Sequence, residues 1–377
     1  MKKIYALCLF TFLAFSFNGC DSSKEKLDPE IEGYTKGIIN DVIDVPEVSA
    51  IEYSTAGLPI YQSNPDAPVS IYVAYDGGDY RSSSQGNFIL SGYNRNGSPD
   101  TFDEQEQADI VRSLEYMAHY FAMFDVNVTT IEEVRDASKA WSSIIVTEDH
   151  SGGRANKGAF GTYPWSKAYC GSSTLTSSDK SRRIAHEIGH TFSLEHSGIW
   201  NNGEFYKWED WPQWSNGDRA YGTIMGGGGK GQRNGWSNDA YPKDSDGGKQ
   251  NTMNIIRQKI RSVDSKSNGW RKDDFLDNEK FYLYDNKSGG GYRQGILGSP
   301  DDVDVFTFAW GGGKFKLSAG AVSVSAALLD VGVFNKDNQQ VATEGESNLP
   351  AGDYTIEIRS NGDYGAIGTY QVAILTN

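Results

Sequence analysis

The feature that most constrains this chain is the run from Ile184 to His196, Ile-Ala-His-Glu-Ile-Gly-His-Thr-Phe-Ser-Leu-Glu-His, which holds three of the five histidines. On an α-helix, His186 and His190 are about one turn apart and project from one face, so both imidazoles can bind the same ion. Glu187 lies between them, near enough to reach a water molecule on that ion without displacing it. His196 lies too far along to share this face. The chain therefore has to leave the helix and fold back to supply a third nitrogen.

Three neutral imidazoles with an open fourth position are typical of a catalytic zinc site, because a structural site is closed by a fourth protein ligand. The alternative is a chance match, since a bare His-Glu-x-x-His pattern also arises in helices without metal. The third histidine favours the metal, and only two other histidines occur in the chain. We therefore predict one catalytic Zn²⁺, bound by His186, His190 and His196.

The pattern His-Glu-x-x-His-x-x-Ser-x-x-His over residues 186–196 resembles that of the metzincin zinc metalloproteases, in particular the reprolysin-like ones. Their sequence is His-Glu-x-x-His-x-x-Gly-x-x-His, followed downstream by a "Met-turn". Residues 221–226, Tyr-Gly-Thr-Ile-Met-Gly, resemble that turn. The resemblance implies that Glu187 is the catalytic general base. It also implies that Met225 forms an apolar floor beneath the three imidazoles without binding the metal.

Two positions depart from the metzincin pattern. Ser193 stands where the family usually has a glycine, whose backbone freedom lets the helix end and the chain turn towards the metal. A serine there is expected to cost about 1 kcal/mol of strain. Gly227 stands where some metzincins have a tyrosine that is an extra zinc ligand. We therefore expect three histidines and water only.

The N-terminus is typical of an export signal. Lys2 and Lys3 form a basic start, and Ile4 to Phe17 is an almost unbroken apolar run, too short for a permanent membrane helix. Phe17-Asn18-Gly19-Cys20 resembles a bacterial lipoprotein cleavage box. Residues 1–19 would then be a lipoprotein signal peptide, and Cys20 would carry the lipid that anchors an extracytoplasmic protein facing the periplasm or the cell surface. The alternative is an ordinary secretory signal with a free Cys20.

The cysteines and the net charge indicate which disulfides and which partners the protein can have. With Cys8 removed and Cys20 lipidated, Cys170 has no partner for an intramolecular disulfide, and we expect it to be a small buried residue in a strand. The net charge of −15 and a pI near 4.8, with no basic cluster beyond the first residues, make nucleic acid an unsuitable partner. We expect a monomer whose partners are a protein or peptide substrate and the membrane.

Residues 20–65 are polar and only weakly patterned, with proline-containing breaks. The preferred interpretation is a tether that holds the enzyme away from the membrane. The alternative is a short inhibitory pro-segment that blocks the zinc through a carboxylate such as Asp41 or Asp44.

Residues 66–267 are predicted to form the zinc metallopeptidase domain, an α+β fold with a mixed twisted sheet, the zinc helix and the Met-turn. A capping box at Thr101 and Glu104 begins a helix whose apolar stripe is Ile110, Leu114, Met117 and Phe121. The remaining predicted elements are strands at Val69–Tyr75, Val126–Thr130 and Trp141–Thr147, an edge strand at Tyr169–Thr174 and a helix at Lys249–Val263. As an edge strand, Tyr169–Thr174 could pair with an extended peptide.

One stretch in this domain hints at a second metal. Asp244-Ser245-Asp246-Gly247 has the start of a calcium loop, but it lacks the remaining ligands of an EF-hand. A turn is therefore the preferred interpretation, and Ca²⁺ has no further support.

Residues 275–377 show short alternating segments separated by glycine, asparagine and aspartate, which indicates an all-β sandwich. The segments Ile296–Phe306 and Leu349–Tyr354 resemble parts of the bacterial pre-peptidase C-terminal domain. That resemblance implies a spacer, a stabiliser or a weak binding module rather than a catalytic domain.

Together these observations favour a lipid-anchored zinc endopeptidase, in which Glu187 accepts the proton of a zinc-bound water and passes it to the leaving amine. Two alternatives stay open. One is a cell-surface binding protein without proteolytic activity, and the other is a zinc amidase that acts on cell-wall peptide. The amidase would require a cleft that lacks an edge strand for an extended peptide.

Overall fold

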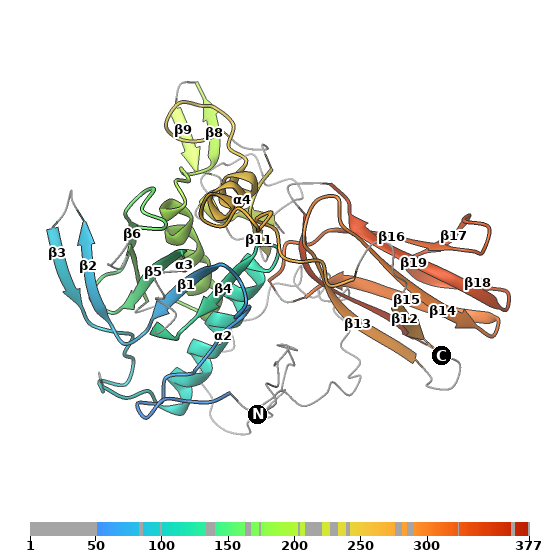
Figure 1. Ribbon diagram of the computed structural model, residues 1–377, viewed down its shortest axis with the longest axis horizontal. Helices are drawn as coiled ribbons and strands as arrows, with labels where there is room; N and C mark the ends of the chain where they lie inside the picture. The colour runs from blue at the N-terminus through green and yellow to red at the C-terminus, as the bar shows by residue number, and fades with distance from the viewer. Residues whose placement is uncertain are drawn as a thin grey trace. The chain divides into compact units, whose positions relative to one another are not determined.

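Figure 1 shows the computed structural model of the chain, which describes residues 51–82, 86–98, 100–132, 140–162, 167–172, 175–202, 204–207, 221–226, 233–238, 242–275, 281–284, 290–322, 324–362 and 366–375. Apart from Ile51, these residues belong to one compact unit, Glu52–Asn377. The predicted signal peptide and Cys20 lie outside the described residues.

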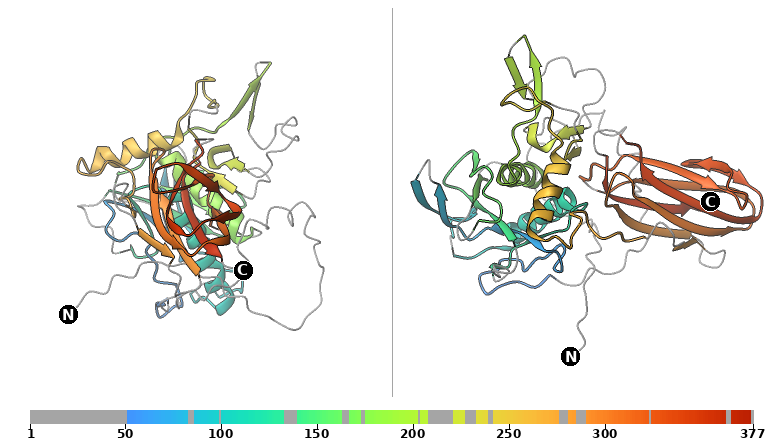
Figure 2. Two further views of the ribbon diagram at one scale, coloured as in Figure 1. Left: turned by 90° about the vertical axis from the view of Figure 1, so that its right-hand side faces the viewer. Right: turned by 45° about the horizontal axis from the view of Figure 1, so that its top comes forward.

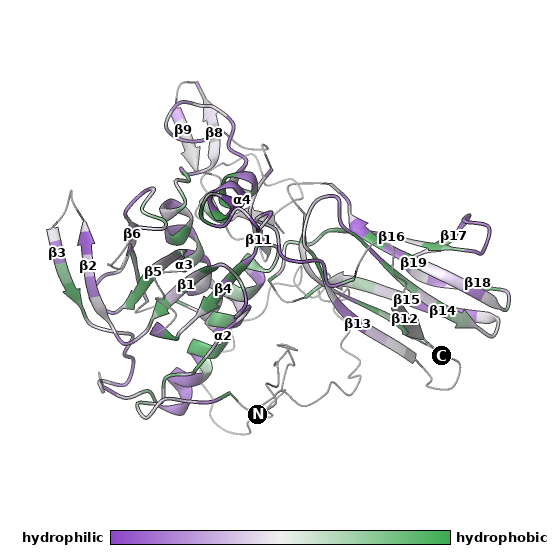
Figure 3. Ribbon diagram, in the orientation of Figure 1, coloured by the Kyte–Doolittle hydropathy of each residue, from purple (hydrophilic) through white to green (hydrophobic). Residues whose placement is uncertain are grey.

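A five-stranded sheet with the order β4-β1-β5-β7-β6 forms the core of the first part of this unit. Strands β4, β1, β5 and β7 run parallel, and β6 pairs antiparallel with β7. Strands β1 and β5 are buried along almost their whole length, as expected for parallel strands covered on both faces of the sheet. Figure 3 shows that hydrophobic residues predominate in both strands. The bounds are β1 (Val69–Ala74), β4 (Val126–Thr129), β5 (Ala140–Thr147), β6 (Gly153–Ala155) and β7 (Ala168–Gly171). The first three predicted strands are confirmed.

The predicted strand at Tyr169–Thr174 is present over Tyr169–Gly171 as part of β7, but its predicted position at the edge of the sheet is wrong. Strand β7 lies between β5 and β6 and is buried at every residue. After β5 the chain turns back through residues 148–152, and Gly171 N donates to Gly152 O at 2.7 Å. The short strand β6 is thereby laid along β7, so β6 is the last strand of the described sheet on this side.

Helices α2 (Glu104–Phe121) and α3 (Ser177–Thr191) pack against each other and against this sheet, as Figure 1 shows. The apolar stripe predicted for α2 is confirmed, because Ile110, Leu114, Met117 and Phe121 are all buried. The predicted C-terminal helix is α4 (Thr252–Val263), which buries Met253, Ile256 and Ile260.

The predicted start of α2 is wrong by two residues. The N-cap is Asp103, whose side chain accepts from the backbone of Gln105 and Glu106, while the Glu106 side chain accepts from Asp103 N at 3.1 Å. Thr101 and Glu104 fit the same sequence pattern as Asp103 and Glu106. The second pair forms the capping box because Asp103 is the residue directly before the first helical turn.

Three short pairings extend from this framework, and the sequence patterns did not predict them. Strands β2 and β3 form one hairpin, and β8 and β9 form another that projects away from the helices in each view of Figure 2. Strands β10 and β11 pair in parallel next to the 3₁₀ turn η5 (Ile224–Gly226). Their bounds are β2 (Gly78–Ser82), β3 (Gly86–Leu90), β8 (Gly198–Asn201), β9 (Glu204–Lys207), β10 (Tyr221–Thr223) and β11 (Arg233–Gly235).

The described end of the predicted tether packs on the sheet. Ser63 N donates to Val128 O at 3.0 Å, and Tyr61 N donates to the Thr130 hydroxyl at 3.0 Å. Tyr61 is buried. These residues lie along β4, at the opposite edge of the sheet from β6.

The C-terminal part consists of two sheets, with the orders β12-β14-β19-β16-β17 and β13-β20-β15-β18. Their inner faces meet in an apolar core, in which the Phe308 and Phe315 rings lie 5.8 Å apart between centroids. The bounds are β12 (Phe281–Tyr284), β13 (Gly290–Leu297), β14 (Val303–Trp310), β15 (Gly313–Ala321), β16 (Leu329–Phe334), β17 (Gln340–Thr343), β18 (Gly345–Leu349), β19 (Gly352–Ser360) and β20 (Gly368–Leu375). This arrangement agrees with the predicted sandwich.

The fold is thus mixed α+β, and most of its sheets are antiparallel. None of the helices in the described part of the chain has the length and apolar character needed to cross a membrane.

Candidate metal centre

Helix α3 positions the first two predicted ligands. The Thr176 side chain caps its first turn, and Ile184 and Ile188 are buried on the side that faces the core. His186 and His190 lie on another side of the helix and are partly exposed. The buried isoleucines therefore fix the rotation of the helix that presents both imidazoles outward.

The helix ends where the sequence departs from the metzincin pattern. Ser193 has φ 76°, the left-handed conformation that glycine adopts most readily. Next to it, Leu194 N donates to Gly189 O at 3.2 Å, which closes the helix end. Ser193 therefore adopts the left-handed conformation for which the pattern has glycine, and the residues that follow bring His196 back towards α3.

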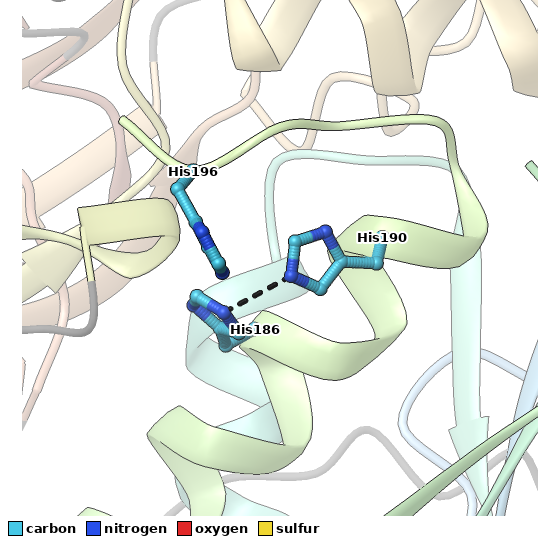
Figure 4. Close-up of side chains that lie close together, drawn as sticks. All are labelled: His186, His190 and His196. Carbon is cyan, nitrogen blue, oxygen red and sulfur yellow. Dashed lines mark hydrogen bonds between the residues drawn. The ribbon is translucent and has the colours of Figure 1, made fainter. Parts of the chain in front are cut away.

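The three predicted histidines come together. One nitrogen atom from each of His186, His190 and His196 lies within 4.8 Å of the others, so the group could hold a metal ion (Figure 4). Nε2 of His190 lies 3.2 Å from Nε2 of His186, the pair joined by the dashed line in Figure 4. Two ligands about 2.1 Å from a common ion, at a tetrahedral angle, lie about 3.4 Å apart. The observed spacing is close to that value.

The contacts of the Nδ1 atoms indicate which ring nitrogens carry a proton and which carry a lone pair. His186 Nδ1 lies 2.8 Å from Ile224 O, and His190 Nδ1 lies 2.7 Å from Leu194 O. Carbonyl oxygens only accept hydrogen bonds, so we assign the proton to each Nδ1 and the lone pair to each Nε2. Two Nε2 lone pairs then face each other at 3.2 Å. Such a donor set fits a cation.

Burial keeps one of these ligands neutral. Removal from water, only partly offset by the hydrogen bond to Leu194, lowers the pKa of His190 to about 4. A neutral imidazole is the form that binds a metal.

Met225 lies in η5 against α3. It is buried, and a Cβ atom added to Gly189 would come within 2.5 Å of its sulfur, so the helix and the turn are in close contact at that glycine. The backbone of η5 also accepts two hydrogen bonds near the histidines. Ile224 O accepts from His186, and Met225 O accepts from the N–H of Ser197, the residue after His196, at 2.9 Å. Gly227 lies outside the described residues.

Glu187 lies beside β6. Its side chain is buried, with 7% of its surface exposed, and it packs against Gly153. The general base proposed from the sequence is therefore next to β6, the last strand of the described sheet on this side, and next in sequence to His186.

A carboxylate that sequence reasoning did not assign to the site faces the third histidine. Asp244 Oδ2 lies 3.0 Å from His196 Nδ1. The two residues are 48 positions apart in the sequence, and no local pattern joins them. The nearby Asp246 instead accepts from Gly248 N at 2.9 Å and pairs with Lys243, as expected for a turn rather than a calcium loop.

A second group of carboxylates lies away from the histidines. Asp273, Asp302 and Asp304 bring one oxygen each within 4.8 Å of the others. Asp304 is fully buried and accepts a hydrogen bond from the Tyr370 hydroxyl, and burial raises its pKa to about 9.

Cys170, His119 and His150 do not belong to the group of three histidines. Cys170 is buried in β7, as predicted, and burial raises the pKa of its thiol to about 12. His119 is buried in α2, where its Nδ1 lies 2.7 Å from the Thr369 hydroxyl. His150 is exposed and stacks on Tyr169, with 4.8 Å between ring centroids.

Comparison with known proteins adds only distant structural matches to these observations. No protein-family model matches the chain. No curated protein matches it either.

Solved structures match about a quarter of the chain. The periplasmic inhibitor of g-type lysozyme from Salmonella Typhimurium is 16% identical and has a TM-score of 0.21, with 26% of this chain and 97% of that chain covered. The inhibitor from Aeromonas hydrophila is 17% identical, with a TM-score of 0.22 and coverage of 26% and 94%. The pre-peptidase C-terminal domain of a Bacillus anthracis collagenase is 16% identical, with a TM-score of 0.21 and coverage of 28% and 97%.

Proposed function

We propose that this protein is a zinc-dependent endopeptidase of the metzincin type, anchored to a bacterial membrane through Cys20 and acting on extracytoplasmic proteins or peptides. The observation that carries the proposal is the convergence of one ring nitrogen from each of His186, His190 and His196, while Nδ1 of each ring lies within hydrogen-bond distance of an oxygen acceptor. His186, His190 and His196 would hold the ion. Bound there, zinc would polarise the scissile carbonyl and acidify a water molecule.

Glu187 is the proposed general base. Glu187 follows His186 on the helix, and its carboxylate is buried against Gly153 of β6. It would accept the proton of the attacking water and donate it to the leaving amine. Met225 would keep the histidines in place through its contact with α3, without binding the ion.

The edge of the sheet supports a peptide as substrate. Strand β6 is the last strand of the described sheet on the side of Glu187, and its outer backbone groups can pair with an extended chain. This edge favours an endopeptidase over the amidase, which needs a cleft without such a strand.

The test is cleavage of an unfolded protein and of a diverse peptide library by the purified full chain in detergent. We expect cleavage that is lost on chelation, restored by zinc, and reduced about 100-fold or more in Glu187→Gln. The matched control is Glu195→Gln, which changes a partly exposed glutamate of the same segment that pairs with Lys157. Bound zinc without any cleavage, both in the full chain and in a chain that begins at residue 66, would contradict the proposal and favour the binding protein. Cleavage only of cell-wall peptide would favour the amidase.

N-terminal sequencing separates the two roles of residues 20–65. A tether predicts that the active protein begins at the lipidated Cys20. An inhibitory pro-segment predicts that activity appears only after cleavage within this segment.

A further inference from the structure

The three histidines are held in different ways. His186 and His190 are fixed by the helix and donate to backbone carbonyls. His196 lies beyond the helix, its side chain is 28% exposed, and its Nδ1 faces a carboxylate. Because no helix fixes this ring, its orientation depends on the group that accepts its proton.

The segment that carries Asp244 is joined to the segment that carries His196 by backbone hydrogen bonds. The N–H of Asp244 donates to His196 O at 3.1 Å, and Gly198 N donates to Pro242 O at 3.0 Å. Asp244 therefore contacts His196 twice, through a backbone hydrogen bond and through its carboxylate, which faces the imidazole ring. This two-point attachment leaves the His196 ring little freedom to rotate.

The turn that carries Asp244 is itself fixed. Lys243 N donates to Gly248 O at 2.8 Å, and Trp200 Nε1 from the β8–β9 hairpin donates to Lys243 O at 3.0 Å. Glu195, next to His196, donates from its N–H to the Gln250 side chain at 2.8 Å. Residues 243–250 thus hold the third histidine from both sides.

We propose that Asp244 is a positioning residue that orients His196 and sets the affinity of the site for zinc; this inference rests on the proposed function. The carboxylate accepts the Nδ1 proton, so that Nε2 carries the lone pair and points at the ion. Its negative charge also makes Nε2 a stronger donor, and it offsets part of the charge of the ion. Removal of such an outer carboxylate typically weakens metal binding about 10–100-fold.

Asp246 provides a matched control within the same turn. Its carboxylate accepts from Gly248 N and pairs with Lys243, and its role is to close the turn. Loss of Asp246 therefore tests the turn, whereas loss of Asp244 tests the contact with the ring.

The experiment measures the zinc dissociation constant of the metal-free full chain by competition with a chromophoric chelator. For Asp244→Asn we expect an increase of about 10–100-fold, with partial recovery in Asp244→Glu. For Asp246→Asn we expect a change within about twofold. Thermal unfolding of the metal-free proteins shows whether the variants keep the parent fold.

Unchanged affinity in Asp244→Asn overturns the inference and leaves the proposed function standing. An equal loss in Asp246→Asn also overturns it, because the effect then belongs to the folding of the turn. Failure of the parent to bind zinc overturns both the proposed function and this inference.

Discussion

A Cβ atom placed on Gly153 would lie 2.4 Å from Oε1 of Glu187 and 2.8 Å from its Cγ. The absence of a side chain at this one position of β6 is what allows the Glu187 carboxylate to lie against the strand. Any larger residue has to displace either the strand or the carboxylate.

Gly153→Ala should therefore lose activity while it keeps the metal. Displacing a catalytic group by about 1 Å can cost about 100-fold in rate, and we expect a loss of that order in peptide cleavage. Zinc affinity, measured by chelator competition, should stay within about twofold, since the ligands are untouched. Gly152→Ala is the control, because a Cβ there meets no atom within 4 Å. Full activity in Gly153→Ala would contradict this prediction, because it would show that catalysis does not depend on the contact between Glu187 and Gly153.

Ser193→Gly should stabilise the protein. The left-handed backbone at φ 76° costs an L-residue about 1–2 kcal/mol, and part of the gain is offset by the greater freedom of glycine in the unfolded chain. We expect the free energy of unfolding to rise by about 0.5–1 kcal/mol in urea titrations with EDTA. Ser193→Ala keeps the strain and should show no gain. A glycine variant less stable than the alanine variant would contradict this account.

His119 should make the protein less stable in acid. Burial lowers its pKa from 6.5 to about 4, so the unfolded chain binds more protons between these values. Its contribution is present above pH 6.5 and is lost as the pH falls to about 4, by up to about 3 kcal/mol. His119→Gln can still hydrogen-bond to Thr369 but does not titrate. Denaturant titrations from pH 7.5 to 4 should show a smaller loss in the variant, and parallel curves would exclude the effect.

Asp304 should have the opposite pH dependence. Burial raises its pKa from 3.8 to about 9, so the folded protein binds more protons across this range. Its contribution is complete below pH 4 and is lost as the pH rises towards 9. Asp304→Asn, compared with the parent in EDTA, should gain stability relative to it between pH 5 and pH 9. The conclusion is wrong if the difference between the two proteins is independent of pH.

Local spacing was enough to predict the helix that carries His186 and His190. The spacing of His186, Glu187 and His190 is a property of one helix, and the apolar stripe of α2 is likewise contained in one segment. The strands β1, β4 and β5 were predictable because each is a short segment rich in β-branched and aromatic residues.

Relationships between distant segments were not predictable in the same way. Asp244 meets His196 only because two loops are joined through backbone hydrogen bonds. Strand β6 has three residues, Gly-Arg-Ala, which is too short to show an alternating pattern. The sequence therefore pointed to the apolar β7 as the edge, although pairing with β6 makes it internal.

The division of the ligands between one helix and one loop also determines the order in which the site can assemble. His186 and His190 are correctly spaced as soon as α3 forms, but His196 reaches them only after the turn at residues 243–248 and η5 have packed around it. If the site holds the proposed ion, it would bind that ion late, because it is incomplete until tertiary packing is finished, and the ion would then oppose unfolding of that packing. Metal capture would thus mark the last stage of maturation, and amide exchange in residues 194–198 and 243–250 would slow when the ion binds.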